Sequence, residues 1–253
     1  MSNQAGVSGR QSGRIFFGSD FVGANGSAAV LGPDIQAFGV GTETYAATVD
    51  ESGGILALGT GASDDDNALI RCGPFSPRDG KMVMHCRFKY DALTTIAVFA
   101  GFAETLDTTT PVMPQEFATA TLTYNPGGSV GIGYDTDGTT DDFRAGMGDG
   151  GAAISDSGNG TRANATLTAD LFFEAQVTLN EDGSAEVWFG DSGHPAGSGT
   201  ENKLRLIKRF STGTLLTVTD LFFAVLMVET RTTAASTLEI DYFGGEAGRD
   251  WRP

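Results

Sequence analysis

The sequence has few of the residues that carry metal or nucleophilic chemistry. It holds two cysteines and two histidines, which excludes a multi-histidine transition-metal site. Neither His85 nor His194 lies in a catalytic motif, and the chain has no Gly-x-Ser-x-Gly elbow and no glycine-rich phosphate loop followed by lysine. In a protein made in the cytoplasm, Cys72 and Cys86 are interpreted as buried thiols rather than a disulfide.

Positive charge and long apolar runs are also scarce. The chain has 16 Lys plus Arg against 32 Asp plus Glu, a formal net charge of −16, and no basic run that could collect phosphates. No stretch approaches the roughly 20 apolar residues of a membrane helix. The N-terminus lacks the basic start and apolar segment of a secretory signal. We therefore expect no nucleic-acid or membrane partner, and assembly in the cytoplasm.

Short alternating segments and 36 glycines dominate what is present, and no helical stripe of ten or more residues occurs. This pattern predicts one all-β domain over residues 14–253. Residues 1–13 contain no large apolar side chain except Met1 and Val7, which predicts an extended N-terminal arm. The expected strands are 15–17, 55–58, 82–90, 95–102, 117–124, 130–134, 171–179, 185–189, 204–210, 221–228 and 237–243.

Four of these segments carry the clearest information. Residues 82–90 alternate between apolar side chains and Val83, His85, Arg87 and Lys89, so one face is core and the other is wetter. Residues 171–179 and 185–189, joined by an Asn-Glu-Asp-Gly turn, form the best predicted hairpin. Residues 221–228 are apolar on both faces, which suits a central strand covered on each side or a strand buried in a subunit contact.

Two acidic clusters suggest a hard cation. Asp64, Asp65 and Asp66 crowd one loop, and Asp135 and Asp137 begin a second. Unpaired like charges so close together are either solvated or neutralised, and carboxylate oxygens are what calcium prefers. The second loop is not an EF-hand, because its twelfth position is glycine. Calcium is the specific hypothesis for both clusters, and a solvated turn is the alternative.

The last expected strand, 237–243, is consistent with a structural strand and also with part of an active site. Leu238, Ile240 and Tyr242 alternate with Glu239, Asp241 and Phe243. This spacing resembles the Glu-x-Asp strand of the concanavalin-like β-sandwich glycosidases. The next carboxylate, Glu246, lies beyond a Gly-Gly pair, whereas retaining chemistry needs two carboxyl groups about 5 Å apart. We interpret the strand as an exposed polar face and expect no enzyme activity.

Two tryptophans and two long polar loops bear on sugar binding. Trp188 and Trp251 could stack on sugars, but a strand tryptophan between Val187 and Phe189 is interpreted as core. The segments 146–165 and 190–202 are interpreted as surface connections at the ends of the sheets.

The whole pattern resembles a family of structural proteins of tailed bacteriophages with a concanavalin/laminin-G-like jelly-roll β-sandwich. The resemblance covers about residues 50–251 through short motifs in the same order. They are 54–61 followed by Asp66-Asn67, 99–105, 131–137, and 238–243 through 249–251.

This resemblance implies an antiparallel jelly-roll sandwich that serves as a capsid decoration or cement protein. Its partners are then the major capsid protein and copies of itself, in a homo-oligomer such as a trimer, on the virion surface. Arg10, Arg14, Phe222 and Leu226 are the expected contact residues. The alternatives are a carbohydrate-binding receptor module of a tail fibre and, third, a β-sandwich glycosidase.

Overall fold

The computed structural model describes residues 14–19, 21, 31, 34–48, 54–91, 94–104, 106–118, 121–125, 127–138, 140–150, 152–153, 160–164, 167, 169–191, 204–211 and 216–248. Regular structure in these residues is β-strand, apart from one 3-10 turn, η1 (Pro77–Asp79). The predicted all-β class is confirmed. Within the described ranges, no helix has the length and apolarity needed to cross a membrane.

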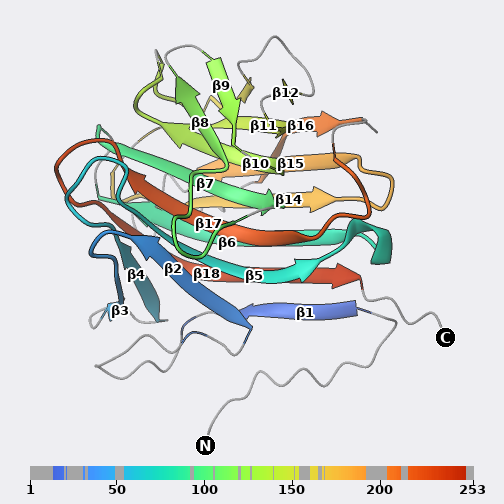
Figure 1. Cartoon of the computed structure of the whole chain (residues 1–253), viewed down its shortest axis with the longest axis horizontal. Helices are drawn as coiled ribbons and strands as arrows, with labels where there is room; N and C mark the ends of the chain where they lie inside the picture. Colours follow the sequence, from blue (N-terminus) through green and yellow to red (C-terminus); the bar gives the residue numbers. More distant parts are fainter. Residues whose placement is uncertain are drawn as a thin grey trace, which may run out of the picture.

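Two antiparallel sheets lie face to face (Figure 1). Sheet A has the order β16 (Arg205–Phe210), β15 (Ala185–Asp191), β14 (Phe173–Leu179), β6 (Met82–Tyr90), β18 (Thr237–Gly248), β4 (Ile55–Gly59) and β3 (Thr44–Thr48), with β1 (Arg14–Ser19) beside β18. Sheet B has the order β12 (Ala152–Ala153), β11 (Arg144–Asp149), β10 (Gly128–Asp135), β7 (Ile96–Ala103), β17 (Phe222–Thr230), β5 (Asn67–Phe75) and β2 (Ile35–Val40), with β13 (Thr161–Arg162) beside β11. A small hairpin, β8 (Gln115–Ala118) and β9 (Thr121–Tyr124), forms a third sheet.

Most of the expected strands are present, with two kinds of error. The segment 117–124 is not one strand but lies across the β8–β9 hairpin. The strand β5 was missed, because it carries Arg71 and a Gly73-Pro74 pair and is buried on both faces, so its sequence shows no alternation. The strands β2, β3, β11, β12 and β13 were also missed, since they lie in polar or glycine-rich segments.

Aromatic side chains fill one end of the space between the sheets. Phe143 lies among them, with its ring centroid 4.4 Å from that of Phe189 and 5.1 Å from that of Phe173. Tyr90 and Tyr134 stack at 5.8 Å from opposite sheets. Such pairs contribute about 0.5–1.5 kcal/mol each beyond the burial of their area. This packing supports the inner face of sheet A. The outward face of the same sheet is therefore backed by a well-packed core.

Part of the outer face of sheet B is covered by the chain itself, where the connection between β7 and β8 crosses it (Figure 1). Leu106 and Met113 of this connection pack on the outward side chains of β5, β7 and β17. The strand β17 is therefore a central strand with both faces buried, the first of the two predicted explanations. The expectation that Phe222 and Leu226 contact a neighbour is wrong, because both are fully buried between the sheets.

Candidate functional site

The outward face of sheet A, here called the polar face, carries both aromatic and charged side chains. The predicted alternation of β6 is confirmed: Met82, Met84, Cys86, Phe88 and Tyr90 are buried and the residues between them are half-buried. The strands β14 and β15 follow the same rule and pair as the predicted hairpin, with Leu179 opposite Ala185. Their outward residues are thereby aligned across the sheet.

A bulge in β18 changes which of its side chains reach the polar face. The pairing of β18 with β6 shifts register between Ile240 and Tyr242, leaving Asp241 as the extra residue. The predicted alternation, which puts Tyr242 on the same face as Leu238 and Ile240 and puts Phe243 on the face of Glu239, is therefore wrong. Phe243 is fully buried, and Tyr242 is half-buried with its ring 5.5 Å from that of His85. Glu239, as predicted, stays on the outward side.

Ion pairs tie the carboxylates of the polar face to cations. Lys89 Nζ lies 2.7 Å from Glu239 Oε2. Arg87 donates a hydrogen bond to Asp241 Oδ2, and its Nε lies 3.7 Å from Glu174 Oε1. The Arg87 guanidinium also stacks on the Phe172 ring, 4.0 Å from its centroid. Each of these carboxylates is thus held in place as a hydrogen-bond acceptor beside a donor.

The third carboxylate of the possible catalytic set lies apart from the first two. Glu246 forms an ion pair with Arg14 on the edge strand β1. Beyond Asp241, the Gly244-Gly245 pair continues β18, and the Tyr242 hydroxyl lies 2.7 Å from where a Cβ at Gly244 would be. The polar face therefore offers paired, ionic carboxylates rather than the two opposed carboxyl groups of a glycosidase.

One row of side chains crosses four strands of the polar face. On its first strand, Trp188 lies opposite Leu206 of β16 on one side and Gln176 of β14 on the other. Gln176 lies opposite His85 of β6, whose far neighbour is Gly244 of β18 beside the Tyr242 ring. The interpretation of Trp188 as core is wrong: its neighbours Val187 and Phe189 are fully buried, while Trp188 is half-buried and donates from Nε1 to Glu186 Oε2 at 3.3 Å.

His85 stands in the middle of this row with an unsatisfied nitrogen. Its Nε2 atom has no hydrogen-bond partner among the described residues, and the nearest carboxylate oxygen, Glu174 Oε2, is 4.0 Å away. Burial lowers the pKa of His85 below its ordinary value, against the opposing effect of Glu174. The lowered pKa favours the neutral ring, and the Nε2 atom that lacks a partner is itself buried.

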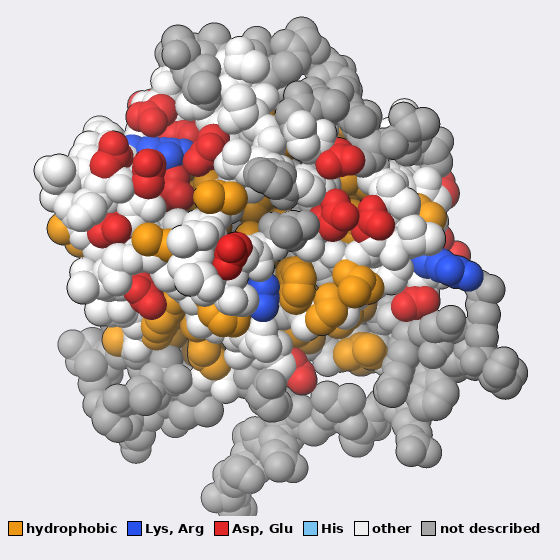
Figure 2. Space-filling model, viewed as in Figure 1, with side chains coloured by type: hydrophobic (Ala, Val, Ile, Leu, Met, Phe, Trp, Pro, Cys, Tyr) orange, Lys and Arg blue, Asp and Glu red, His pale blue; other side chains and the backbone are white. Residues whose placement is uncertain are grey.

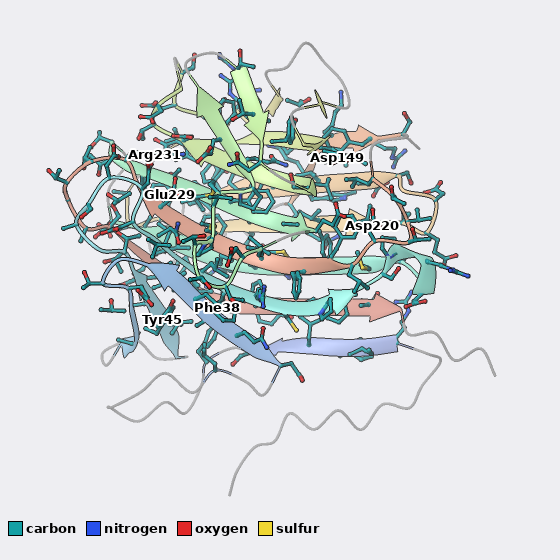
Figure 3. The ribbon with its side chains drawn as sticks, viewed as in Figure 1. Phe38, Tyr45, Asp149, Asp220, Glu229 and Arg231 are labelled. Carbon is teal, nitrogen blue, oxygen red and sulfur yellow. The ribbon has the colours of Figure 1, made fainter. Side chains whose placement is uncertain are left out.

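The two predicted calcium loops come together at one end of the sandwich, around an arginine that the sequence analysis did not single out. We call this group the Arg231 cluster: Arg231 with Asp65, Glu116, Asp135, Asp137 and Glu229. Figure 3 labels Arg231 and Glu229 side by side near the end of β17. In the same view, Figure 2 shows acidic side chains crowded around a basic one at that end.

The guanidinium of Arg231 is the centre of the cluster. Its Nη2 lies 2.8 Å from Asp135 Oδ2, and its Nη1 lies 2.5 Å from Glu229 Oε1 and 3.2 Å from Asp65 Oδ1. The side chains of Arg231, Asp135 and Glu229 are only 6%, 1% and 3% exposed. Asp135 also accepts hydrogen bonds from the Phe117 and Asp137 backbone amides, so one carboxylate joins three segments of chain.

One guanidinium does not neutralise five carboxylates. The pKa of Glu229 is raised to about 8, chiefly by burial, with Arg231 opposing the rise and Glu116 and Asp65 adding to it. The pKa of Asp137 is also raised, first by burial and then by Asp135. The Arg231 guanidinium already occupies the centre of these carboxylates. The cluster therefore links the loops structurally through a cation that belongs to the protein.

Calcium has no ligand set in the described part of the chain, where no three His, Cys, Asp or Glu side chains are arranged to hold a metal ion. Asp64 is exposed, and Asp66 is buried and accepts a hydrogen bond from the Ser63 amide, as in a turn. Both residues therefore fit the alternative to calcium, which is a turn whose carboxylates are solvated or accept hydrogen bonds from the turn's own backbone. The sequence analysis did not use the one signal that could have identified Glu229 and Arg231. That signal is a Glu-x-Arg pattern at the end of an apolar strand.

The remaining predicted residues divide between edge positions and undescribed segments. Arg14 is committed to Glu246 within the same chain. Arg10, His194, Trp251 and the N-terminal arm lie outside the described residues. Both cysteines are buried and unpaired, which confirms their interpretation as thiols.

Comparisons with known proteins support the fold. No family model matches the sequence, and no curated protein sequence matches it. A protein of unknown function from Shewanella oneidensis MR-1 has a similar structure, with a TM-score of 0.57, 13% identity, and 95% of this chain and 89% of that chain covered. Peanut lectin, solved with a nine-residue peptide, has a TM-score of 0.55 at 12% identity, with 93% and 98% covered. The chain thus has the concanavalin or legume-lectin type of β-sandwich fold.

Proposed function

We propose that this protein is a carbohydrate-binding module and that the polar face is its binding surface. The observation that carries the proposal is the row from Trp188 through Gln176 and His85 to Tyr242. Sugar rings have apolar faces that stack on aromatic side chains, and hydroxyl groups that both donate and accept hydrogen bonds. The row provides both kinds of partner on a rigid sheet.

The fold adds support to this proposal, since the architecture is shared with a lectin. Function still resides in the site rather than the fold. Here the site has the half-buried Trp188, the half-buried Gln176 amide, and fixed donor and acceptor pairs such as Lys89 with Glu239. The cations that neutralise its carboxylates support binding over hydrolysis.

A glycan array followed by calorimetry tests the proposal. The wild-type chain should bind at least one class of glycan, and Trp188→Ala should weaken that binding by roughly tenfold or more, as truncation of a tryptophan anchor does. Val112→Ala is the matched control, because Val112 is 49% exposed on the connection over sheet B. Equal binding by Trp188→Ala and the wild type would remove the polar face from this account.

The virion setting is a second, separate proposal that rests on the sequence resemblance alone. It places the module on a phage particle assembled in the host cytoplasm, either as a decoration protein bound to the major capsid protein or as part of a fibre. Mass spectrometry of purified particles tests whether the chain is present. Electron microscopy of the same particles distinguishes head from tail, and absence from every particle fraction would overturn the setting.

A further inference from the structure

We infer that the ligand of the polar face is an uncharged oligosaccharide, which lies across the strands from Trp188 on β15 to Tyr242 on β18. This inference rests on the proposed function and adds the class, length and direction of the ligand. Three features carry it: the carboxylate partners of the central cations, the cross-strand positions of the aromatic rings, and the hydrogen-bonding groups between them.

The first feature is charge pairing. Both cations of the central strand β6 have carboxylate partners: Arg87 pairs with Asp241 and Glu174, and Lys89 pairs with Glu239. Arg209, on the strand β16 of the same sheet, pairs with Glu186. A sulfate, phosphate or carboxylate on a sugar would need a guanidinium or ammonium without such a partner. To bind an acidic sugar here, an existing ion pair would have to break. The net charge of −16 also repels anions over a longer range.

The second feature is the spacing of the aromatic rings. Trp188 and His85 are two strands apart, with Gln176 between them, and β18 with Tyr242 is one strand further. Neighbouring strands lie about 4.8 Å apart, so the row is about 14 Å long. A single sugar ring covers one of these positions. A chain of several rings can contact both aromatic ends, and for this it must run across the strands rather than along them.

The third feature is the set of hydrogen-bonding groups between the aromatic ends. The half-buried Gln176 amide offers a donor and an acceptor between the aromatic ends. Beside it, the Arg87 and Asp241 pair presents a donor next to an acceptor. A sugar hydroxyl does the same, so these groups suit it better than they suit an anion, which only accepts.

The experiment compares neutral and acidic probes of matched length. Cello-, manno- and xylo-oligosaccharides from disaccharide to hexasaccharide are titrated against the wild-type chain, alongside uronic-acid and sulfated oligosaccharides of the same sizes. We expect affinity for at least one neutral series to rise with length and then level off, and roughly tenfold or weaker binding of the acidic probes at equal length.

Glu239→Gln adds a reciprocal test, because it removes the carboxylate that lies 2.7 Å from Lys89 Nζ. This variant should gain affinity for the acidic probes several-fold, and the gain should shrink as salt is added. The control is Glu181→Gln, which removes the same charge at the exposed turn between β14 and β15 and should bring no such gain.

Each outcome separates the inference from the proposed function. Preferential binding of acidic probes by the wild type would overturn the inference and leave the carbohydrate-binding function standing. Saturation by a monosaccharide, with no gain from longer chains, would overturn the cross-strand placement. If the wild type binds no glycan on the array, the proposed function itself is wrong and the inference ends with it.

Discussion

At the scale of single residues, Arg231 shows how one buried cation organises a molecule rich in acidic groups. It receives carboxylates from the ends of β10 and β17, from β8 and from the loop before β5. Removing one partner from a buried ion pair leaves an uncompensated charge and typically costs about 3–5 kcal/mol. The excess of carboxylates over cations makes the cluster sensitive to pH.

Glu229→Gln should reduce the pH dependence of folding stability. Burial raises the pKa of Glu229 from the ordinary 4.5 to about 8 in the folded state. Between these values the folded chain binds more protons than the unfolded chain, so the free energy of unfolding falls as pH rises through this window and is flat outside it. One such group contributes a slope of up to about 1.4 kcal/mol per pH unit. Denaturant unfolding from pH 4 to 9 measures it.

The same series with Glu181→Gln, an exposed glutamate of the β14–β15 turn, gives the control slope. Glu181→Gln should follow the wild type, while Glu229→Gln should be flatter above about pH 4.5. If Glu229→Gln keeps the wild-type slope across the window, the raised pKa does not belong to Glu229.

At the scale of elements, local packing decided which strand faces are free. The strand β17 is apolar on both faces, as an interface strand would be. The connection from β7 to β8 nevertheless covers its outer side with Leu106 and Met113. The bulge in β18 instead exposes a side chain expected to be buried: it places Tyr242 on the polar face and Phe243 in the core. One extra residue in a strand thus reassigns every side chain that follows it.

Met113→Ala should destabilise the protein far more than Val112→Ala. Met113 is fully buried against the outer face of sheet B, and truncating a buried methionine typically costs about 2–5 kcal/mol. Val112, its neighbour in the chain, is 49% exposed, and such surface changes usually stay within about 0.5 kcal/mol. Chemical denaturation of the two variants measures the difference. Similar unfolding free energies would show that this connection does not cover the sheet.

At the scale of the whole molecule, the two sheets share one core and should unfold together. The main cluster of buried residues includes side chains from both sheets, such as Leu56 and Phe88 of sheet A and Ile70 and Phe102 of sheet B. This continuity is the basis for expecting one cooperative unit over the described ranges.

The two thiols test this cooperativity, because Cys72 lies on β5 of sheet B and Cys86 on β6 of sheet A. Burial raises the pKa of Cys72 to about 12 and raises that of Cys86 as well, so neither reacts as a thiolate in the folded state. Both should react with a thiol reagent only through global unfolding, at equal rates under mild denaturant. Mass spectrometry of labelled peptides measures each rate, and a much faster Cys72 would show that sheet B opens alone.

Much of the fold could be predicted, and the reason lies in particular strands. The segments 82–90 and 171–179 alternate cleanly because each has one face in the core and one in water. The strand β5 was missed because both of its faces are buried, which removes the alternation. Of the candidate site, the outward positions of His85 and Glu239 could be predicted, whereas that of Trp188 could not: its apolar neighbours suggested core.

The sequence by itself determined the all-β class, the acidic surface, the buried thiols and the polar side of each alternating strand, because these follow from composition and from a period of two. Only the tertiary structure decided which polar groups meet. Arg231 bonds Asp65, 166 positions away, and Arg87 bonds Asp241, 154 positions away. Such pairs depend on strand order and register, which local sequence does not encode. For that reason two expected calcium loops became one arginine-centred joint, and an expected core tryptophan became part of a binding surface.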